Sequence, residues 1–237
     1  MTSASTEVAL VAALEREVGG LIRGWTHVER EHAGRKFVFF ERDELIVVCG
    51  GIGAEAARRA AEAVIGLYHP AMLQSVGFAG ALGTTLQIGD IFVPGVIVDA
   101  CDNSRTEIPG GSGVLVTFMA VAGVEQKKNL AQAYGAQAVD MEAAAVAAAA
   151  SAHGLRYGAI KVISDELNFE MPEMARFIDS RGRFKTGSFT AFAMLRPWLW
   201  MRVAQLGKNS SKAARTLAAH LRGLRSSPVS AVEAKSV

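Results

Sequence analysis

The chain has 237 residues and a mass of 25.1 kDa, with 50% apolar and 20% charged residues, which excludes a disordered chain and predicts one large α/β domain with at most an appendage. Only two cysteines are present, so neither a disulfide scaffold nor a four-cysteine zinc site is expected. The formal net charge of +2 conceals an asymmetry, because the residues after Asp179 carry +10 and the first 179 residues carry −8.

The N-terminal segment predicts a buried strand and then a hairpin. Val8–Ala13 is a short apolar run, and Glu15–Leu21 is typical of a loop or the start of a helix. Charged residues interrupt the apolar run and no basic segment precedes it, so we expect neither a signal peptide nor a membrane span, and a cytoplasmic protein. Phe37–Phe40 and Leu45–Cys49 predict the two strands of the hairpin.

The next segment predicts a helix between two glycine-rich turns. Gly50–Gly53 opens a predicted helix over Ala54–Tyr68. Met72–Val76 and Ile91–Val98 predict strands, with a turn at Gly77–Gly83 between them. The first turn fits a dinucleotide-binding pattern, but the strand that follows lacks the acidic residue that would hold a ribose. A dinucleotide cofactor is therefore not expected.

The C-terminal half of the domain continues the alternation. Asn103–Gly113 is a polar loop, Val114–Phe118 predicts a strand, Ala143–His153 an alanine-rich helix and Tyr157–Ile163 a buried strand. Strands separated by helices predict a three-layer α/β/α domain with a largely parallel or mixed sheet, which we assign to residues 1–190.

Residues 191–237 predict a basic, amphipathic, helical tail. Its apolar residues on or near one face are Leu199, Val203, Leu206, Ala213, Leu217, Leu221 and Leu224. Trp198 and Trp200 lie together near its start, as in helices that bind a membrane surface. Peripheral contact with the inner membrane is one prediction, and packing on the body or on another subunit is the other. No aromatic and basic stacking platform recurs, so no nucleic acid partner is expected.

Three acidic residues stand where an α/β sheet binds its ligands. Glu17 follows the first strand, Glu142 opens the alanine-rich helix and Asp165 ends a strand. Each also has an ordinary explanation, since Glu142 complements a helix dipole and Asp165 caps a turn. The five histidines lack metal-ligand spacing, so no metal is expected.

Five motifs then occur in a characteristic order over about two-thirds of the chain. They are AALEREV (Ala12–Val18), CGGIG (Cys49–Gly53), SVGFAGALGTTLQIGDIFVP (Ser75–Pro94), AVDMEAAAVA (Ala138–Ala147) and VISD (Val162–Asp165). In these motifs the chain resembles the purine nucleosidase/nucleoside phosphorylase superfamily, and is most similar to its methylthioadenosine/S-adenosylhomocysteine nucleosidase branch. The resemblance implies a nucleoside phosphorylase/hydrolase-like fold with a central mixed sheet, a purine nucleoside substrate, no cofactor and a homo-oligomer.

The resemblance also assigns roles to the three acids. Asp165, supported by Ser164, would protonate N7 of the leaving purine. Glu142 would accept hydrogen bonds from the ribose 2′- and 3′-hydroxyls, which strengthen as positive charge develops on the sugar. Glu17 would activate the attacking water. The other substrate-binding residues that it implies are Met141 beneath the sugar, Lys161 where the family often has an arginine, and the turn of Gly77, Phe78, Ala79 and Gly80.

Water is the favoured nucleophile and phosphate is the alternative. Phosphorolysis needs a cradle for a dianion, and the phosphorylase branch places arginines where this chain has ALERE and Ser75–Phe78. The carboxylate of Glu17 would repel phosphate. Arg16, Arg58 and Arg59 are the residues that could reverse this preference, although we expect surface charges there. A third hypothesis is a non-catalytic protein that binds a nucleoside or docks on a membrane.

Departures from the nucleosidase pattern concern the substrate. Phe78 replaces a small residue, and Thr117–Ala122 lacks the aspartate and the aromatic residue of the usual base-contacting run. The segment between Asp99 and Val139 is shorter than in the family and is expected to lack a helix, which leaves room for a larger 5′-substituent. The tail also resembles that of a branch associated with hopanoid biosynthesis. We therefore expect a preference for lipophilic 5′-substituents, such as that of adenosylhopane.

Overall fold

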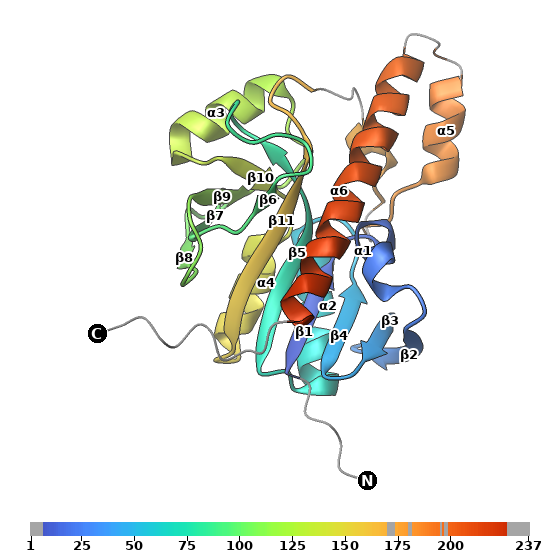
Figure 1. The fold of residues 1–237 in the computed structure, drawn as a ribbon, viewed down its shortest axis with the longest axis vertical. Helices are drawn as coiled ribbons and strands as arrows, with labels where there is room; N and C mark the ends of the chain where they lie inside the picture. The colour runs from blue at the N-terminus through green and yellow to red at the C-terminus, as the bar shows by residue number, and fades with distance from the viewer. Residues whose placement is uncertain (1–6, 170–173, 180–181, 195, 197–198, 227–237) are drawn as a thin grey trace.

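A mixed β-sheet runs through the middle of the molecule (Figure 1). The computed structural model describes residues 7–169, 174–179, 182–194, 196 and 199–226, and within them the sheet has eleven strands. The strands are β1 (Val8–Ala12), β2 (Thr26–His32), β3 (Arg35–Arg42), β4 (Leu45–Cys49), β5 (Met72–Ala81), β6 (Ile91–Phe92), β7 (Val96–Asp99), β8 (Arg105–Glu107), β9 (Val114–Thr117), β10 (Ala138–Asp140) and β11 (Arg156–Asp165).

The order of the strands is β2-β3-β4-β1-β5-β10-β9-β7-β8, and β11 pairs with both β5 and β6. β1 is parallel to β4 and β5, and β11 is parallel to β5. The remaining strands include antiparallel pairs, such as β10 with β5. Because β1, β5 and β11 run in the same direction, their carboxyl ends meet at one edge of the sheet, where α/β proteins bind ligands.

Helices cover both faces of the sheet, which makes the predicted three-layer α/β fold with a mixed central sheet (Figure 1). The helices are α1 (Glu15–Ile22), α2 (Ala54–Tyr68), α3 (Val124–Tyr134), α4 (Ala143–Ala152), α5 (Thr186–Met194) and α6 (Trp200–Ser226), with a 3-10 turn at Met174–Phe177. α2 and α4 pack on one face and α1 and α6 on the other. Since both faces are covered, β1, β5 and β11 are buried almost throughout, as their apolar sequences require.

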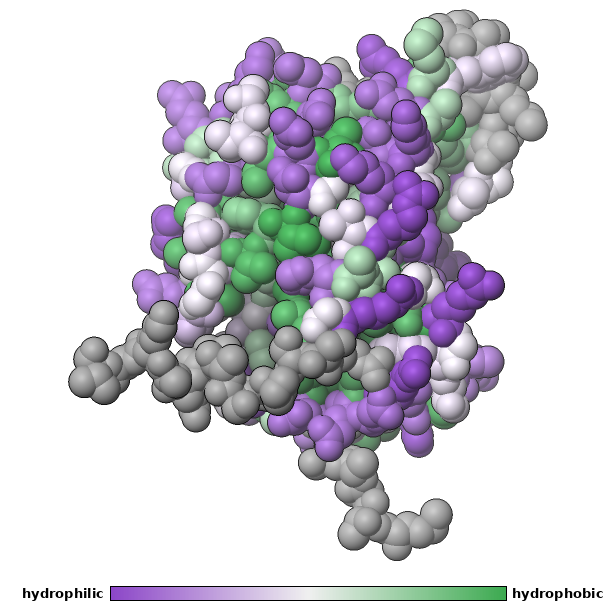
Figure 2. Space-filling model, in the orientation of Figure 1, coloured by the Kyte–Doolittle hydropathy of each residue, from purple (hydrophilic) through white to green (hydrophobic). Residues whose placement is uncertain are grey.

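The long helix α6 packs its apolar face on the body of the protein. Ala213, Leu217 and Leu221 are buried against α1 and the sheet, while the outer side of α6 is largely hydrophilic (Figure 2). The predicted boundary between residues 190 and 191 falls inside α5. Trp198 and residues 227–237 of the predicted tail lie outside the described residues. In the part of the chain that the structure describes, no helix is long and apolar enough to cross a bilayer.

The helix over Ala54–Tyr68 and the β3–β4 hairpin are confirmed, but the second predicted glycine turn is wrong. β5 continues through Gly77 and Gly80 as far as Ala81. Gly77 has a φ of +147°, which a glycine adopts without strain, so the glycines that indicate a turn here serve a strand.

The region between β5 and β10 also differs from its predicted form. The predicted strand Ile91–Val98 is divided at Pro94, which cannot donate to a ladder, and the predicted loop Asn103–Gly113 contains β8. The expectation that the segment between Asp99 and Val139 lacks a helix is wrong, because α3 lies there. The sequence pattern also gives no signal for β2, an edge strand that is exposed along most of its length.

Candidate active site

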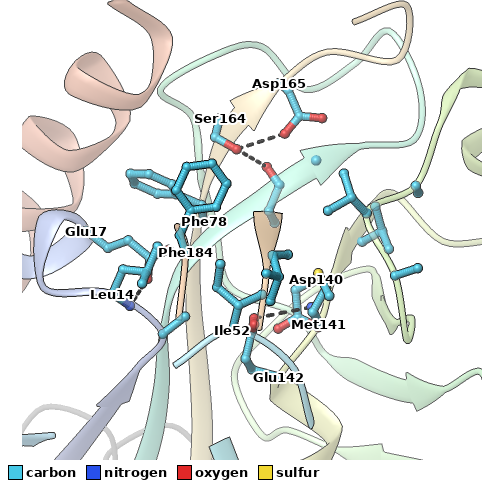
Figure 3. A pocket seen from close by; sticks show the side chains of 18 of the residues that line it. Leu14, Glu17, Ile52, Phe78, Asp140, Met141, Glu142, Ser164, Asp165 and Phe184 are labelled. Carbon is cyan, nitrogen blue, oxygen red and sulfur yellow. Dashed lines mark hydrogen bonds between the residues drawn. The ribbon is translucent and has the colours of Figure 1, made fainter. Parts of the chain in front are cut away.

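A pocket opens at the carboxyl ends of the parallel strands β1, β5 and β11, beside the segment that follows the antiparallel strand β10 (Figure 3). Its wall contains Glu17 after β1, the Phe78–Gly80 segment of β5, the Met141–Glu142 segment after β10 and the Ser164–Asp165 end of β11. The three acids that the sequence singles out therefore share one pocket, although most of the chain separates the first from the last.

Glu17 is a buried carboxyl group in the first turn of α1, with 6% of its surface exposed. Its Oε2 accepts a hydrogen bond of 3.4 Å from the backbone N–H of Leu14. Burial, helped by the charge of Glu142, raises the pKa of Glu17 to about 7. A carboxyl group with such a pKa exchanges protons readily near neutral pH, as a general base must.

Glu142 lines the pocket at the start of α4 and is held by backbone amides. Its Oε1 accepts a hydrogen bond of 2.8 Å from the N–H of Gly53, and its Oε2 lies 3.3 Å from the nitrogen of Met141. Burial, followed by the charge of Asp140, raises the pKa of Glu142 to about 7. Its carboxylate is thus fixed in direction and available to hydroxyl donors in the pocket.

The glycine turn that holds Glu142 is not a phosphate cradle. Gly51 donates its N–H to Ala13, and Ile52 donates its N–H to the carbonyl of Gly182 at 2.7 Å. Since Gly53 donates to Glu142 and Gly50 to the carbonyl of Ala12, all four amides of this turn have acceptors within the protein. The dinucleotide pattern in the sequence therefore marks a structural turn.

A buried ion pair lies behind Glu142. Lys161 Nζ is 2.8 Å from Oδ2 of Asp140 and donates to Oγ of Ser75 at 2.9 Å, and Thr117 donates to Oδ1 of Asp140 at 2.6 Å. Burial by itself lowers the pKa of Lys161, but the charges of Asp140 and Glu142 outweigh it and raise the pKa above its usual value. Lys161 therefore lies behind the wall of the pocket and acts on Glu142 through its charge.

Asp165 has hydrogen-bond partners at both carboxylate oxygens. Ser164 Oγ donates to Oδ1 at 2.8 Å, and Lys127 Nζ lies 2.5 Å from Oδ2. Lys127 also donates to the carbonyl of Glu166 at 2.7 Å. The Lys127 side chain comes from α3, is 2% exposed and contributes to the wall of the pocket.

Two glycines of β5 make room for these carboxylates. A Cβ atom at Gly77 would lie 2.7 Å from Oε2 of Glu17, and one at Gly80 would lie 2.8 Å from Oδ2 of Asp165. Of the predicted glycine–aromatic segment, Phe78, Ala79 and Gly80 line the pocket, whereas Gly77 supports it from behind.

Two aromatic rings and one arginine lie near Glu17 on the α1 side of the pocket. Phe78 and Phe184 lie close together there (Figure 3), and Phe184 forms a β-bridge with Ile178. The guanidinium of Arg16 is 5.6 Å from the ring centre of Phe184. Arg16 is solvent-exposed but contributes to the pocket wall.

The other two arginines considered as possible phosphate-binding residues lie away from the pocket. Arg58 and Arg59 are on the exposed side of α2 and pair with Glu55 at 3.0 and 2.7 Å. They are surface charges, as expected.

Sequence reasoning missed Lys127 and Phe184. Lys127 lies on a helix with a weak periodic pattern, and Phe184 comes from a segment without one, so neither gives a signal. Asp140 was also not predicted as a site residue, although the sequence gives a signal for it, because it immediately precedes the Met141–Glu142 motif. Among the described residues, no group of three His, Cys, Asp or Glu side chains is placed to hold a metal ion.

Comparison with known proteins finds similarity in sequence and in fold. Residues 7–118 and 100–195 match the phosphorylase superfamily. A curated relative, the 5′-methylthioadenosine/S-adenosylhomocysteine nucleosidase of Buchnera aphidicola subsp. Schizaphis graminum (strain Sg), is 25% identical over 91 residues. These residues are 37% of this chain and 39% of that relative, so the chain matches well under half of its length.

Solved structures share the fold over nearly the whole chain. A 5′-methylthioadenosine/S-adenosylhomocysteine nucleosidase from Helicobacter pylori has a TM-score of 0.69 at 18% identity, covering 94% of this chain and 99% of that one. The 5′-methylthioadenosine nucleosidase of Arabidopsis thaliana has a TM-score of 0.70 at 17% identity, with 94% and 96% coverage. The futalosine hydrolase of H. pylori has a TM-score of 0.65 at 20% identity, with 92% and 98% coverage.

Proposed function

The chain belongs to the phosphorylase superfamily, and from this membership and its pocket we propose that it cleaves the N-glycosidic bond of a 5′-modified adenosine and releases adenine. The observation that carries the proposal is the convergence of Glu17, Glu142 and Asp165 in one pocket, each in different surroundings. Groups in different surroundings take different roles, as acid, base and electrostatic support.

Each carboxylate matches one requirement of the reaction. As the C1′–N9 bond breaks, positive charge develops on the sugar and negative charge on the purine. Glu142, anchored by the N–H of Gly53, accepts hydrogen bonds from the ribose hydroxyls and stabilises the positive charge that develops on the sugar. Asp165 with Ser164 delivers a proton to N7 of the purine. Met141 packs beneath the ribose.

Glu17 takes the proton of the attacking water. Its pKa of about 7 allows it to be ionised, and so able to accept a proton, over the upper half of the physiological range. A buried carboxylate at this place repels a phosphate dianion, which favours water as the nucleophile. The place of Arg16 favours the second candidate, a phosphorylase, because its guanidinium is in the pocket wall and forms no salt bridge with any described residue.

The aromatic rings on the α1 side of the pocket support an apolar 5′-substituent. Phe78, Ile178 and Phe184 line this side beside Arg16. A methylthio group, the homocysteinyl group of S-adenosylhomocysteine and a larger lipophilic group such as that of adenosylhopane are the candidates.

Incubation with 5′-methylthioadenosine, with products separated by HPLC, tests the proposal. In phosphate-free buffer we expect adenine and the free methylthiopentose, and an Asp165→Asn variant should lose at least about 10²-fold of the rate. A methylthiopentose 1-phosphate that appears only with added phosphate would identify a phosphorylase. Absence of adenine with 5′-methylthioadenosine, S-adenosylhomocysteine and adenosylhopane alike would contradict cleavage and support a binding protein.

We also propose a homo-oligomer and a peripheral membrane contact. The homo-oligomer is supported by apolar side chains that gather beside α6, in the region where Figure 1 shows β6 and β11 (Figure 2).

The membrane contact is supported by Trp200 and Met201, which are 57% and 85% exposed at the start of the basic helix α6. Size-exclusion chromatography with light scattering tests the first, and the second is tested below.

A further inference from the structure

Asp165, the proposed acid, already accepts hydrogen bonds at both carboxylate oxygens. The ammonium of Lys127 is 2.5 Å from Oδ2, and Ser164 donates to Oδ1 at 2.8 Å. A carboxylate that accepts from an ammonium and from a hydroxyl has no proton of its own to give to the purine, so the proton must come from a neighbour.

Lys127 is the neighbour that has one. Its ammonium is nearly inaccessible, with 2% of the side chain exposed, and two of its three N–H donors go to Asp165 and to the carbonyl of Glu166. Gly80 leaves the space for this pair, because a Cβ there would lie 2.8 Å from Oδ2 of Asp165 and 3.3 Å from Cε of Lys127. The lysine is thus fixed one hydrogen bond behind the carboxylate that faces the purine.

We propose that Lys127 is the source of the proton that neutralises the leaving purine, and that Asp165 relays it. The inference rests on the proposed function, because it concerns the same bond cleavage. A lysine suits this role where an arginine would not, since an ammonium gives up its proton in proteins and a guanidinium keeps its own.

Lys127 loses one proton in this reaction and Glu17 gains one, and exchange with solvent restores both residues. The C1′–N9 bond breaks and its electron pair goes to the purine. A proton passes from Nζ of Lys127 to Asp165 and from Asp165 to N7, which leaves Lys127 as a neutral amine and Asp165 as a carboxylate. Water bonds to C1′ and gives its proton to Glu17. Solvent then takes the proton from Glu17 and returns one to Lys127.

The test compares two leaving groups in Lys127→Met and Lys127→Arg. One substrate is 5′-methylthioadenosine, whose purine needs a proton, and the other is the 4-nitrophenyl 5-methylthioriboside, whose nitrophenolate leaves as a stable anion. Both variants should release adenine about 10²–10⁴ times more slowly than wild type. Both should release nitrophenolate within about threefold of the wild-type rate. Lys128→Met, on the exposed side of the same helix, is the matched control and should be unchanged with both substrates.

The arginine variant separates a proton source from a positioning residue. Arginine retains the positive charge beside Asp165 but cannot deliver a proton, so near-normal adenine release by Lys127→Arg would overturn the proposal. Equal loss with both leaving groups, in variants that melt like wild type, would also overturn it, because it indicates a general role in shaping the pocket. If Lys127→Met melts early, Lys127→Arg carries the test. Wild type that releases no adenine would instead refute the proposed function.

Discussion

Glu17 and Glu142 are carboxyl groups whose pKa values burial raises from the usual range to about 7. Neither has a direct ion-pair partner among the described residues, and each relies on backbone N–H groups and on the charge of Lys161 behind the wall. A pair of this kind destabilises the folded protein when it ionises, which is a cost that a purely structural site would avoid. We therefore expect their effects on activity and on stability to have opposite signs.

Glu17→Gln should lower turnover by about 10²–10⁴-fold with little change in KM, because the amide retains the hydrogen bond from Leu14 but cannot accept a proton. In wild type the rate should fall as the pH decreases below about 7, where Glu17 becomes protonated. Steady-state kinetics from pH 5 to 9 checks both. A wild-type rate that stays level down to pH 5 would contradict a base with this pKa.

The same substitution should stabilise the protein at high pH. Because the pKa of Glu17 rises from 4.5 to about 7 on folding, the folded state binds more protons between these values, and stability falls as the pH rises through that window. Glu17→Gln removes this loss, so it should exceed wild type by up to about 3 kcal/mol at pH 8 and by little at pH 4.5. Urea unfolding at the two pH values measures the difference. Equal stability at pH 8 would indicate that Glu17 is hydrated in solution.

Glu142→Gln should weaken both ribose binding and turnover. A hydrogen bond to a charged group contributes about 1.5–3 kcal/mol, so we expect a loss of about 10–10²-fold in affinity for a non-cleavable adenosine analogue. Calorimetry with the analogue and with its 2′,3′-dideoxy form tests the contact. The dideoxy form should bind wild type and variant alike, and an equal loss for both ligands would place Glu142 away from the hydroxyls.

At the scale of elements, the contact between α1 and α6 positions Glu17. Gly20 of α1 faces Ala218 of α6, and a Cβ at Gly20 would lie 2.8 Å from the Cβ of Ala218. Arg222 of α6 also donates a hydrogen bond to the carbonyl of Gly20. The glycine therefore allows a close approach of two helices, and α6 holds in place the helix that carries Glu17.

Gly20→Ala should destabilise the protein by about 1–3 kcal/mol through overpacking, although alanine is the better helix former. Ala218→Gly in the same chain should restore part of the loss, because it removes the opposing Cβ. Gly19→Ala is the matched control: nothing lies within 4 Å of its Cβ, so it should be neutral or stabilise by up to about 1 kcal/mol. Chemical unfolding of wild type and the three variants measures these differences. A Gly20→Ala variant as stable as Gly19→Ala would show that the helices move apart freely.

At the scale of the whole molecule, α6 and α1 form the helical layer on one face of the sheet. This packing leaves few apolar residues of α6 exposed to a membrane. Ala213, Leu217 and Leu221 are committed to the core. Trp200 and Met201 remain exposed at the start of the helix, beside exposed basic residues. A membrane contact therefore has to use that end of α6, and a chain shortened before it would expose the core.

The double variant Trp200→Ser, Met201→Ser should lose flotation with anionic liposomes while keeping the wild-type melting temperature, because both side chains are exposed. Neutral liposomes provide the control, on which both proteins should float poorly. If wild type and variant float equally on anionic liposomes, the start of α6 is not the contact, and if neither floats the membrane contact is refuted.

The sequence by itself determined the three-layer fold and the strand ends that carry the three acids. Apolar runs, helical periodicity and the order of the five motifs are local signals, and the carboxyl ends of parallel strands meet at one edge whatever the detailed packing. Glu17 and Asp165 could therefore be placed together before any coordinates, whereas only the order of the motifs adds Glu142, which follows the antiparallel strand β10.

Tertiary structure alone decided the Lys127–Asp165 pair, the aromatic side of the pocket at Phe184 and the use of the apolar face of α6. Lys127 and Asp165 are 38 positions apart and meet only because α3, which packs on β9 and β10, extends the Lys127 side chain to the end of β11. The periodicity of α6 predicts an apolar face but not its partner, since a membrane surface and a protein core select the same side chains. The glycines of β5 were misleading for a similar reason, because room for a neighbouring carboxylate and room for a turn require the same residue.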